Sequence, residues 1–382
     1  MRVTGWSWMV ALLVAAGAGQ AVAQEPIRIG GMLETSGVVA ALGNQGLEGA
    51  QLAIDQINAK GGIKGRKIEF INVNTESDET KSVTVARRLI DRDKVVGIIG
   101  AMNSGSNLAI IDTVQRAKLP LISNGATRTI VSPAADRPWI FQAPLNDLLV
   151  IRVSLQHMKA AGIARIGVIN SDTAFGLSGL EAWKQLASGA GVTIVQTQTY
   201  GNQDQDMTPQ LTNLRQPDIQ AVVLWGTGPG QAIVAKNYRQ LGLSVPLYAS
   251  HGAADPNLIR LAAEAAEGII LPASKLYVAD SLPEGDPQKA LTVAFIKDFT
   301  AKYNRPPATF AGNGYDAARI LATGLEQGGT DAAKMRDTIE GLRGFIGVTG
   351  IYSYGKDDHF GITDASVVML TIRQGKFALA AR

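Results

Sequence analysis

The sequence predicts an α/β protein built from two doubly wound lobes, each around a parallel sheet. Short β-branched runs alternate with segments of helical periodicity, which is the pattern of parallel βαβ units. This pattern starts near Ile27 and starts again after Pro144. The length of 382 residues also favours about two domains, since a domain usually takes roughly 100 to 200 residues.

The first half of the chain contains four expected strands with helices between them. After the first strand, Leu47, Ala50 and Ile54 recur at helical spacing, and Gly61-Gly62 ends that helix. Because a helix separates successive strands, the strands are expected to run parallel. The expected strands are Ile27 to Leu33, Lys67 to Val73, Val95 to Ile99 and Leu119 to Ile122.

The second half repeats the alternation after a helix from Asn146 to Ala161. Its expected strands are Arg165 to Ile169, Val192 to Thr197, Ala221 to Trp225, Val245 to Ala249 and Gly268 to Leu271. The chain then becomes mostly helical and ends in two short strands. These last elements are Gln288 to Tyr303, Thr309 to Gln327, Asp331 to Gly341, Ser366 to Ile372 and Phe377 to Leu379.

The first 23 residues have the pattern of a secretory signal peptide. Arg2 is their only charge, an apolar run covers Val10 to Ala16, and Ala21-Val22-Ala23 offers the small residues that a signal peptidase reads. The apolar run is too short to span a membrane. The chain also has no Cys, so disulfides and a lipidated Cys anchor are excluded. We therefore expect a soluble protein that is exported to the periplasm.

Composition and motifs argue against nucleic-acid binding and against catalysis. The 36 Lys and Arg nearly balance the 33 Asp and Glu, and the net charge of +3 is too small to indicate a nucleic-acid-binding surface. The three histidines, His157, His251 and His359, are too far apart for a helical metal pair. The segment from Gly176 to Gly179 lacks the second glycine of a nucleophile elbow. No metal, cofactor or enzymatic activity is expected, and an exported hydrolase remains a remote alternative.

Two α/β lobes in series predict a binding cleft between them. In open α/β sheets, ligands bind outside the carboxyl ends of the strands, and two such sheets can face each other across a cleft. The cleft is therefore the expected functional site.

Several segments resemble the periplasmic leucine/isoleucine/valine-binding protein family, and they are spread over most of the chain after residue 23, so the resemblance extends over nearly all of it. They are Ala50 to Lys67, Ile99 to Ser104, Leu119 to Thr127, Ala174 to Gly176 and Ala266 to Ile270. The resemblance implies a type I periplasmic binding protein fold, with two lobes joined by three crossovers. It also implies a receptor that closes around a small solute and delivers it to an inner-membrane ABC permease. A monomer is expected.

On this resemblance we divide the chain into a signal peptide and two ligand-binding lobes. The signal peptide is residues 1–23. The first lobe comprises residues 24–145 plus 275–353, and the second comprises residues 146–274 plus 354–382.

The resemblance also places a ligand carboxylate near the ends of two strands of the first lobe. Ser104 opens an expected helix, where its hydroxyl and nearby N–H groups can meet an anion. A lone Ser or Thr at such a position more often serves as a helix cap or turn residue. By similarity to the family, the residues expected to hold the carboxylate are Ser104, Gly125, Ala126 and Thr127, and Asn103 is a further ligand-binding candidate.

The sequence departs from the family at the position expected to hold an ammonium group. Amino-acid binders place Glu or Asp there, because a desolvated ammonium needs an opposite charge. An ungapped alignment puts His251 at this position. Histidine suits a hydroxyl, a keto oxygen or a second carboxylate better than an ammonium, although it could also be an ordinary turn residue. A family aromatic near the cleft entrance is replaced by Leu42.

Aromatic residues in both lobes are the remaining site candidates. Phe175 and Trp225 are expected to reach the ligand from the second lobe, unless they serve as core packing. Phe310, Asn313 and Tyr315 begin a helix and are weaker candidates from the first lobe. Their helical spacing fits core packing equally well.

Two ligand classes follow from these residues. The first is a carboxylate without an α-ammonium, either an aromatic or a 2-oxo carboxylic acid. The second is a branched-chain amino acid, with Asp172 or Asp255 pairing with its ammonium instead of His251.

Overall fold

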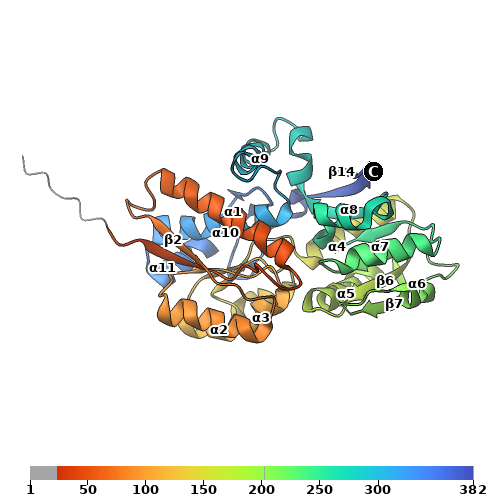
Figure 1. The fold of residues 1–382 in the computed structure, drawn as a ribbon, viewed down its shortest axis with the longest axis horizontal. Coiled ribbons are helices and arrows are strands. Elements are labelled where there is room, and N and C mark those ends of the chain that lie inside the picture. The colour runs from red at the N-terminus through yellow and green to blue at the C-terminus, as the bar shows by residue number, and fades with distance from the viewer. Residues whose placement is uncertain (1–23, 202, 382) are drawn as a thin grey trace, which may run out of the picture.

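The computed structural model describes residues 24–201 and 203–381. Two α/β lobes lie side by side (Figure 1): the elements up to residue 142, together with later helices, form one lobe, and the middle of the chain forms the other. The expected signal peptide lies outside the described residues. The residues at which we divided the lobes stay a prediction.

The first lobe contains a five-stranded parallel sheet in the order β2-β1-β3-β4-β5. Its strands are β1 (Ile27–Gly31), β2 (Ile68–Asn72), β3 (Ile98–Ile99), β4 (Leu121–Ser123) and β5 (Ile140–Gln142). The sequence patterns missed β5, because its apolar run, Trp139 to Phe141, is shorter than the roughly four residues that mark a buried strand in a sequence. The helices between the strands are α1 (Ala40–Ala59), α2 (Glu79–Arg87) and α3 (Ser104–Ala117).

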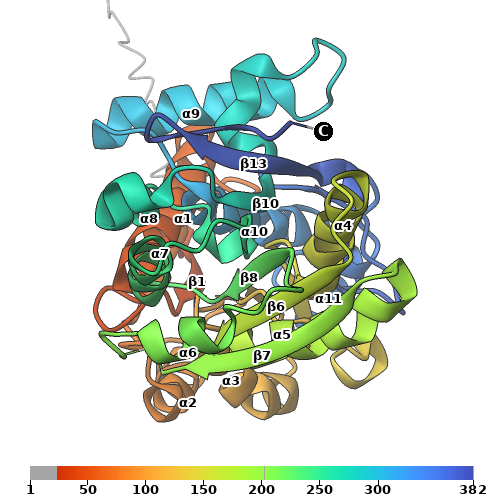
Figure 2. The same cartoon turned by 90° about the vertical axis from the view of Figure 1, so that its right-hand side faces the viewer.

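The second lobe, which faces the viewer in Figure 2, contains a seven-stranded sheet in the order β14-β13-β10-β9-β8-β6-β7. Its parallel strands are β6 (Arg165–Ser171), β7 (Thr193–Tyr200), β8 (Ala221–Trp225), β9 (Leu247–Ala249) and β10 (Ile270–Ser274). Its helices are α4 (Asp147–Ala160), α5 (Ala174–Ala187), α6 (Thr208–Asn213), α7 (Gly230–Gln240) and α8 (Pro256–Ala262).

The two strands near the C-terminus extend this second sheet. β13 (Val367–Arg373) pairs antiparallel with β10, and β14 (Lys376–Leu379) pairs antiparallel with β13. The sequence patterns gave both strands but not their direction. The tight turn between them, with Gly375 at a φ of +68°, forces the antiparallel pairing.

The segment between β10 and β13 returns to the first lobe. It forms α9 (Lys289–Tyr303), α10 (Thr309–Gly328), α11 (Ala332–Glu340) and the short pair β11 (Phe345–Ile346) and β12 (Ile351–Tyr352). The chain thus passes between the lobes after β5, after β10 and after β12. These three passages match the crossovers that the family resemblance implied.

Two glycines allow α10 to approach α1 closely. A Cβ atom added at Gly49 of α1 would lie 1.8 Å from the carbonyl oxygen of Ala311, and one at Gly314 would lie 2.1 Å from that of Gly46. Any larger residue at either position would therefore push the helices apart. This close approach fixes the start of α10, which carries two of the predicted site residues.

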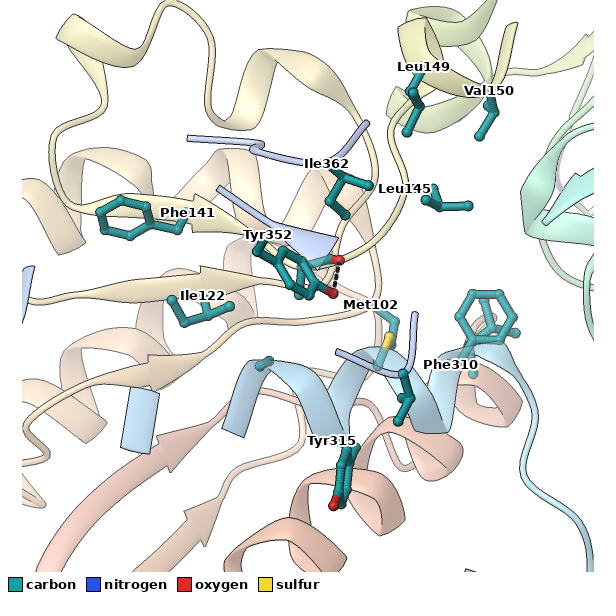
Figure 3. Packing of buried hydrophobic residues seen from close by; sticks show 14 of the residues in the cluster. Met102, Ile122, Phe141, Leu145, Leu149, Val150, Phe310, Tyr315, Tyr352 and Ile362 are labelled. Carbon is teal, nitrogen blue, oxygen red and sulfur yellow. Dashed lines mark hydrogen bonds between the residues drawn. The ribbon is translucent and has the colours of Figure 1, made fainter. Parts of the chain in front are cut away.

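A buried carboxylate ties α10 to the crossover segments. Asp316 accepts hydrogen bonds from the backbone N–H groups of Val348 and Thr349, at 2.9 Å each, and from the hydroxyl of Tyr352 at 3.1 Å. The single hydroxyl proton of Tyr352 is shared between Asp316 and the carbonyl of Ala143, which lies 2.8 Å away, the contact drawn in Figure 3. Burial raises the pKa of Asp316. The network links three separate segments on the first-lobe side of the cleft.

Candidate functional site

An enclosed cavity of about 60 Å³ lies between the lobes. A buried water needs about 10–15 Å³ of such space, so the cavity has room for roughly four to six waters, or for one small solute. Residues from both lobes and from the first crossover line it. They are Val38, Val39, Leu42, Met102, Asn103, Ser104, Asn124, Ala126, Pro144, Leu145, Thr173, Phe175, Thr227, His251, Gly252, Ala273, Ser274, Thr309, Phe310 and Asn313.

The first-lobe wall includes the N-terminus of α3. Asn103 caps this helix, because its side-chain oxygen accepts from the N–H of Gly105 at 2.8 Å. Ser104 is the first helical residue and is buried. Since the start of a helix offers free N–H groups and a positive dipole end, this wall suits an anion such as a carboxylate.

A buried glutamate holds the segment that leads into α3. The carboxylate of Glu34 accepts from the backbone N–H groups of Met102 and Asn103, at 3.0 and 3.1 Å. Burial raises the pKa of Glu34 to about 7, while those backbone hydrogen bonds act in the opposite direction. Both donors belong to residues that line the cavity, so Glu34 positions the wall from outside it.

The loop after β4 forms the neighbouring part of the same wall. Gln142 donates from its side-chain amide to the carbonyls of Gly125 and Thr127, at 2.7 and 3.2 Å. Asn124 donates to the carbonyl of Gly100 at 3.2 Å. These bonds fix the backbone on both sides of Ala126, which faces the cavity.

An aromatic cluster forms the second-lobe wall. The ring of Phe175 stacks on that of Trp225 with centroids 5.8 Å apart, and His251 packs edge-on against both, at 5.4 and 6.0 Å. Phe175 is at the start of α5, Trp225 ends β8, and His251 follows β9. All three positions are therefore at the carboxyl ends of parallel strands, where α/β sheets bind ligands.

His251 is a neutral side chain in this wall, and the only polar group acting on its ring among the described residues is the backbone of Leu145. Neither of its ring nitrogens makes a hydrogen bond of normal geometry to the described part of the chain. Burial lowers the pKa of His251 to about 4, although the nearby backbone of Leu145 acts in the opposite direction. At neutral pH the ring therefore offers one hydrogen-bond donor and one acceptor but no charge.

Other lining residues also carry buried polar atoms that lack a partner among the described residues. They are the side-chain oxygens of Asn124, Ser274 and Thr309. A buried polar group without a partner costs about 1–3 kcal/mol. A polar solute or ordered waters in the cavity would remove this cost, so the arrangement is that of a binding site and not of a sealed core.

Apolar side chains complete the cavity. Figure 3 shows Met102, Leu145 and Phe310, which come from the segment before α3, from the first crossover and from α10. All three line the cavity, as does Asn313 one turn after Phe310. The wall thus combines a few polar groups with a mainly apolar surface, which is usual for small-molecule sites.

Most of the predicted site residues meet at this cavity. The lining includes Asn103, Ser104, Ala126, Phe175, His251, Phe310 and Asn313, as well as Leu42. Gly125, Thr127 and Trp225 do not line it, and Trp225 instead packs on Phe175 and His251. Tyr315 points away, because its hydroxyl donates to Gln56 of α1 at 2.8 Å. Trp225 and Tyr315 therefore serve as packing residues, which is the alternative to ligand contact that their sequence positions leave open.

The sequence reasoning overlooked several polar lining residues. Thr173 caps α5 directly after β6, Thr227 follows β8, and Ser274 ends β10. All three occupy the carboxyl ends of parallel strands in the second sheet. Applying the same positional rule to every strand would have found them.

No lining residue of the cavity within the described chain carries a charge. Of the two carboxylates considered as ammonium partners, Asp172 is exposed and does not line the cavity. Asp255 is buried but lines an adjoining pocket instead. There it accepts from Gln45 of α1 at 3.3 Å, a contact between the two lobes.

Residues 24–201 and 203–381 contain neither a cluster of metal ligands nor a membrane-spanning helix. No group of three His, Asp or Glu side chains there could hold a metal ion. No helix in these ranges is long and apolar enough to cross a membrane.

A comparison with protein families shows to which family the chain belongs. A family model described as periplasmic binding protein matches residues 26–376. The chain belongs to the periplasmic binding protein family. It is a solute-binding receptor of the kind that serves ABC-type transporters, and its family consists of periplasmic receptors and not of enzymes.

Individual members of the periplasmic binding protein family resemble this chain over most of its length. A Leu/Ile/Val-binding protein of Rhizobium johnstonii is 24% identical, and the match covers 97% of this chain and 98% of that protein. A periplasmic binding protein type 1 from Bordetella pertussis is 29% identical with a TM-score of 0.84, covering 94% of this chain and 100% of that one. An extracellular ligand-binding receptor from Rhodopseudomonas palustris HaA2 is 24% identical with a TM-score of 0.87, covering 93% and 99%.

Proposed function

We propose that this receptor binds a small carboxylic acid that lacks an α-ammonium group, either an aromatic or a 2-oxo acid. The observation that carries the proposal is the neutral His251 in a cavity with no charged lining residue among those described. A desolvated ammonium without an opposite charge costs several kcal/mol. A keto oxygen or an aromatic ring needs no such charge.

The two walls support different parts of this ligand. Ser104 and the N-terminus of α3 suit the carboxylate, because hydroxyl and N–H donors and the helix dipole all favour negative charge. Phe175 and Phe310 offer aromatic faces for a planar body. His251 and Ser274 are able to donate to a keto oxygen or a second polar group.

Binding is expected to favour the closed arrangement of the lobes. A ligand that contacts Ser104 on one lobe and His251 on the other interacts with both only when the cleft is closed. Such differential contact shifts the population toward closure. We also propose export through the signal peptide at residues 1–23, a monomeric state, and delivery of the ligand to an inner-membrane ABC permease.

The alternative function is a branched-chain amino-acid receptor. The name of the Rhizobium johnstonii relative favours it. Asp255 would then have to reach the ammonium from the adjoining pocket, which shares Val38, Leu42 and Gly252 with the cavity. That route requires the side chain to give up its present hydrogen bonds with Gln45 and Asn257.

Calorimetric titration of the chain lacking residues 1–23 separates the two functions. The protein is unfolded and refolded first to remove bound solute, and is then titrated with phenylpyruvate, 3-phenylpropionate and leucine. We expect micromolar binding of at least one acid, about −8 kcal/mol, and no heat from leucine. Tight binding of leucine with no response to the acids would contradict the proposal.

Two variants sharpen the result. Under the proposed function, His251→Ala weakens acid binding and Asp255→Ala leaves it within about twofold. Under the alternative, Asp255→Ala abolishes leucine binding, because it removes the partner of a buried charge.

A further inference from the structure

A second pocket adjoins the ligand cavity. It has a volume of about 320 Å³ and shares Val38, Leu42 and Gly252 with the cavity wall. Its other lining residues come from α1 and from the segments around α7 and α8. They are Ala41, Gly228, Pro229, Gln231, Asp255, Asn257, Leu258, Arg260 and Leu261. We call this pocket the outer compartment.

The outer compartment contains a buried glutamine side chain whose nitrogen is hydrogen-bonded and whose oxygen is not. Gln231 is 2% exposed, and its amide nitrogen donates to the carbonyl of Gly252 at 3.3 Å. Its side-chain oxygen is buried and has no hydrogen-bonding partner among the described residues. A buried oxygen without a hydrogen bond destabilises the folded protein, so this oxygen is suited to accept a hydrogen bond from a bound molecule.

The charged groups of the outer compartment favour a neutral donor. One oxygen of Asp255 already accepts from Gln45, at 3.3 Å, and from the backbone and side chain of Asn257, at 3.0 and 3.2 Å. The guanidinium of Arg260 lies in the same lining and is bound to Asn257 at 3.1 Å. The opposite charges of Asp255 and Arg260 offset each other in the lining, and both Asp255 oxygens already accept hydrogen bonds, so a neutral hydroxyl suits the free oxygen of Gln231.

We propose that the outer compartment is a second subsite, in which Gln231 accepts a hydrogen bond from a hydroxyl group at the far end of the ligand. The inference rests on the proposed function, because it needs the carboxylate to lie in the first cavity. It narrows the ligand class to hydroxyl-bearing carboxylic acids, such as a hydroxyphenyl acid whose ring lies near Leu42 and Gly252.

The test compares two probes on three proteins by calorimetric titration. The probes are 3-phenylpropionate and 3-(4-hydroxyphenyl)propionate, which differ only in the hydroxyl. The proteins are the native chain, Gln231→Leu and the matched control Gln210→Leu. Gln210 also carries a buried, unpartnered side-chain oxygen, but it lies on α6, outside both pockets.

We expect the native chain and Gln210→Leu to bind the hydroxylated acid about tenfold more tightly, the effect of one good hydrogen bond. In Gln231→Leu this preference disappears, while the affinity for 3-phenylpropionate stays within about twofold. Equal affinities in the native chain, or a preference that survives in Gln231→Leu, would overturn the inference. If neither acid binds the native chain, the proposed function fails and the inference fails with it.

A second variant tests the compartment without touching a buried residue. Ala41 is on the exposed side of α1 and lines the outer compartment but not the ligand cavity. Ala41→Phe adds a ring there, so it should weaken binding of the hydroxylated acid at least tenfold and leave benzoate binding unchanged. Unchanged binding of both acids would overturn the inference independently of Gln231.

Discussion

Two buried histidines occupy opposite kinds of environment in this protein. His359 lies beside the first crossover, where its Nδ1 is 2.9 Å from the Ile140 carbonyl and its Nε2 is 3.2 Å from the Glu340 carboxylate. His251 lies in the cavity wall with no hydrogen bond of normal geometry to the described chain. Both pack against a phenylalanine ring, Phe141 and Phe175 respectively.

The difference separates a structural histidine from a candidate ligand-binding one. The fold satisfies both nitrogens of His359, so that ring has nothing left to offer a solute. The ring nitrogens of His251 are left for a partner that the described chain does not supply. Burial alone, at 1% and 8% exposure, would not have distinguished the two.

The largest expected effect comes from removing the structural histidine. His359→Ala deletes a buried ring and leaves the carbonyls of Arg137 and Ile140 without their donor. We expect the free energy of unfolding to fall by about 4 kcal/mol. Urea denaturation measures this, and acid binding by the remaining folded protein should stay within about twofold. A loss below about 1 kcal/mol would contradict a structural role for His359 that His251 does not have.

The next effect is on the pH dependence of stability. Burial lowers the pKa of His251 to about 4, whereas an exposed histidine titrates near 6.5. Between these values the unfolded chain takes up a proton that the folded chain does not, so stability falls as the pH drops. From pH 7 to pH 4, the protonation of His251 should lower the free energy of unfolding of the native chain by about 3 kcal/mol. His251→Gln lacks this contribution.

The measurement is the difference between the native chain and His251→Gln in urea denaturation at each pH. Glu34 acts in the opposite direction, because burial raises the pKa of its carboxyl to about 7 and the folded chain binds that proton first. This contribution is common to both proteins and cancels. Parallel pH curves would show that His251 is not held neutral by the fold.

A smaller effect is expected on ligand affinity. His251→Ala should weaken binding of phenylpyruvate about 30-fold, or about 2 kcal/mol, because a polar contact in the cavity is lost. The midpoint of thermal unfolding without ligand should fall less than in His359→Ala, since His251→Ala removes packing against Phe175 and Trp225 but no strong hydrogen bond within the described chain. His157→Ala is the matched control, since His157 bonds Tyr248 and does not line the cavity. Equal loss in both variants would contradict a role for His251 in binding.

The smallest effect concerns the opposite wall. Ser104→Ala should weaken the same acid about fivefold, or about 1 kcal/mol, because the backbone N–H groups of α3 still face the carboxylate. Ser106→Ala is the control, since Ser106 is buried on the same helix but does not line the cavity. An effect of Ser104→Ala larger than that of His251→Ala would reverse the expected ranking of the two walls.

Much of the fold could be predicted from local patterns. The β-branched runs and helical periodicities located most strands and helices to within a few residues, because regular alternation is a local property of the chain. The patterns missed β5, whose apolar run from Trp139 to Phe141 is too short to be recognised as a strand. They also left open the direction of β13 and β14, which depends on pairing with β10, a strand about 100 residues earlier in the chain.

The sequence by itself therefore determined the α/β class, the family resemblance and the strand ends from which the site is built. Only the tertiary structure decided that Ser104, Phe175 and His251 share one cavity while Trp225 and Tyr315 belong to the packing around it. It also decided that His359 is satisfied and His251 is not. The reason is physical: a side chain's burial, its partners and its protonation are set by segments far away in the sequence, and no local pattern records them.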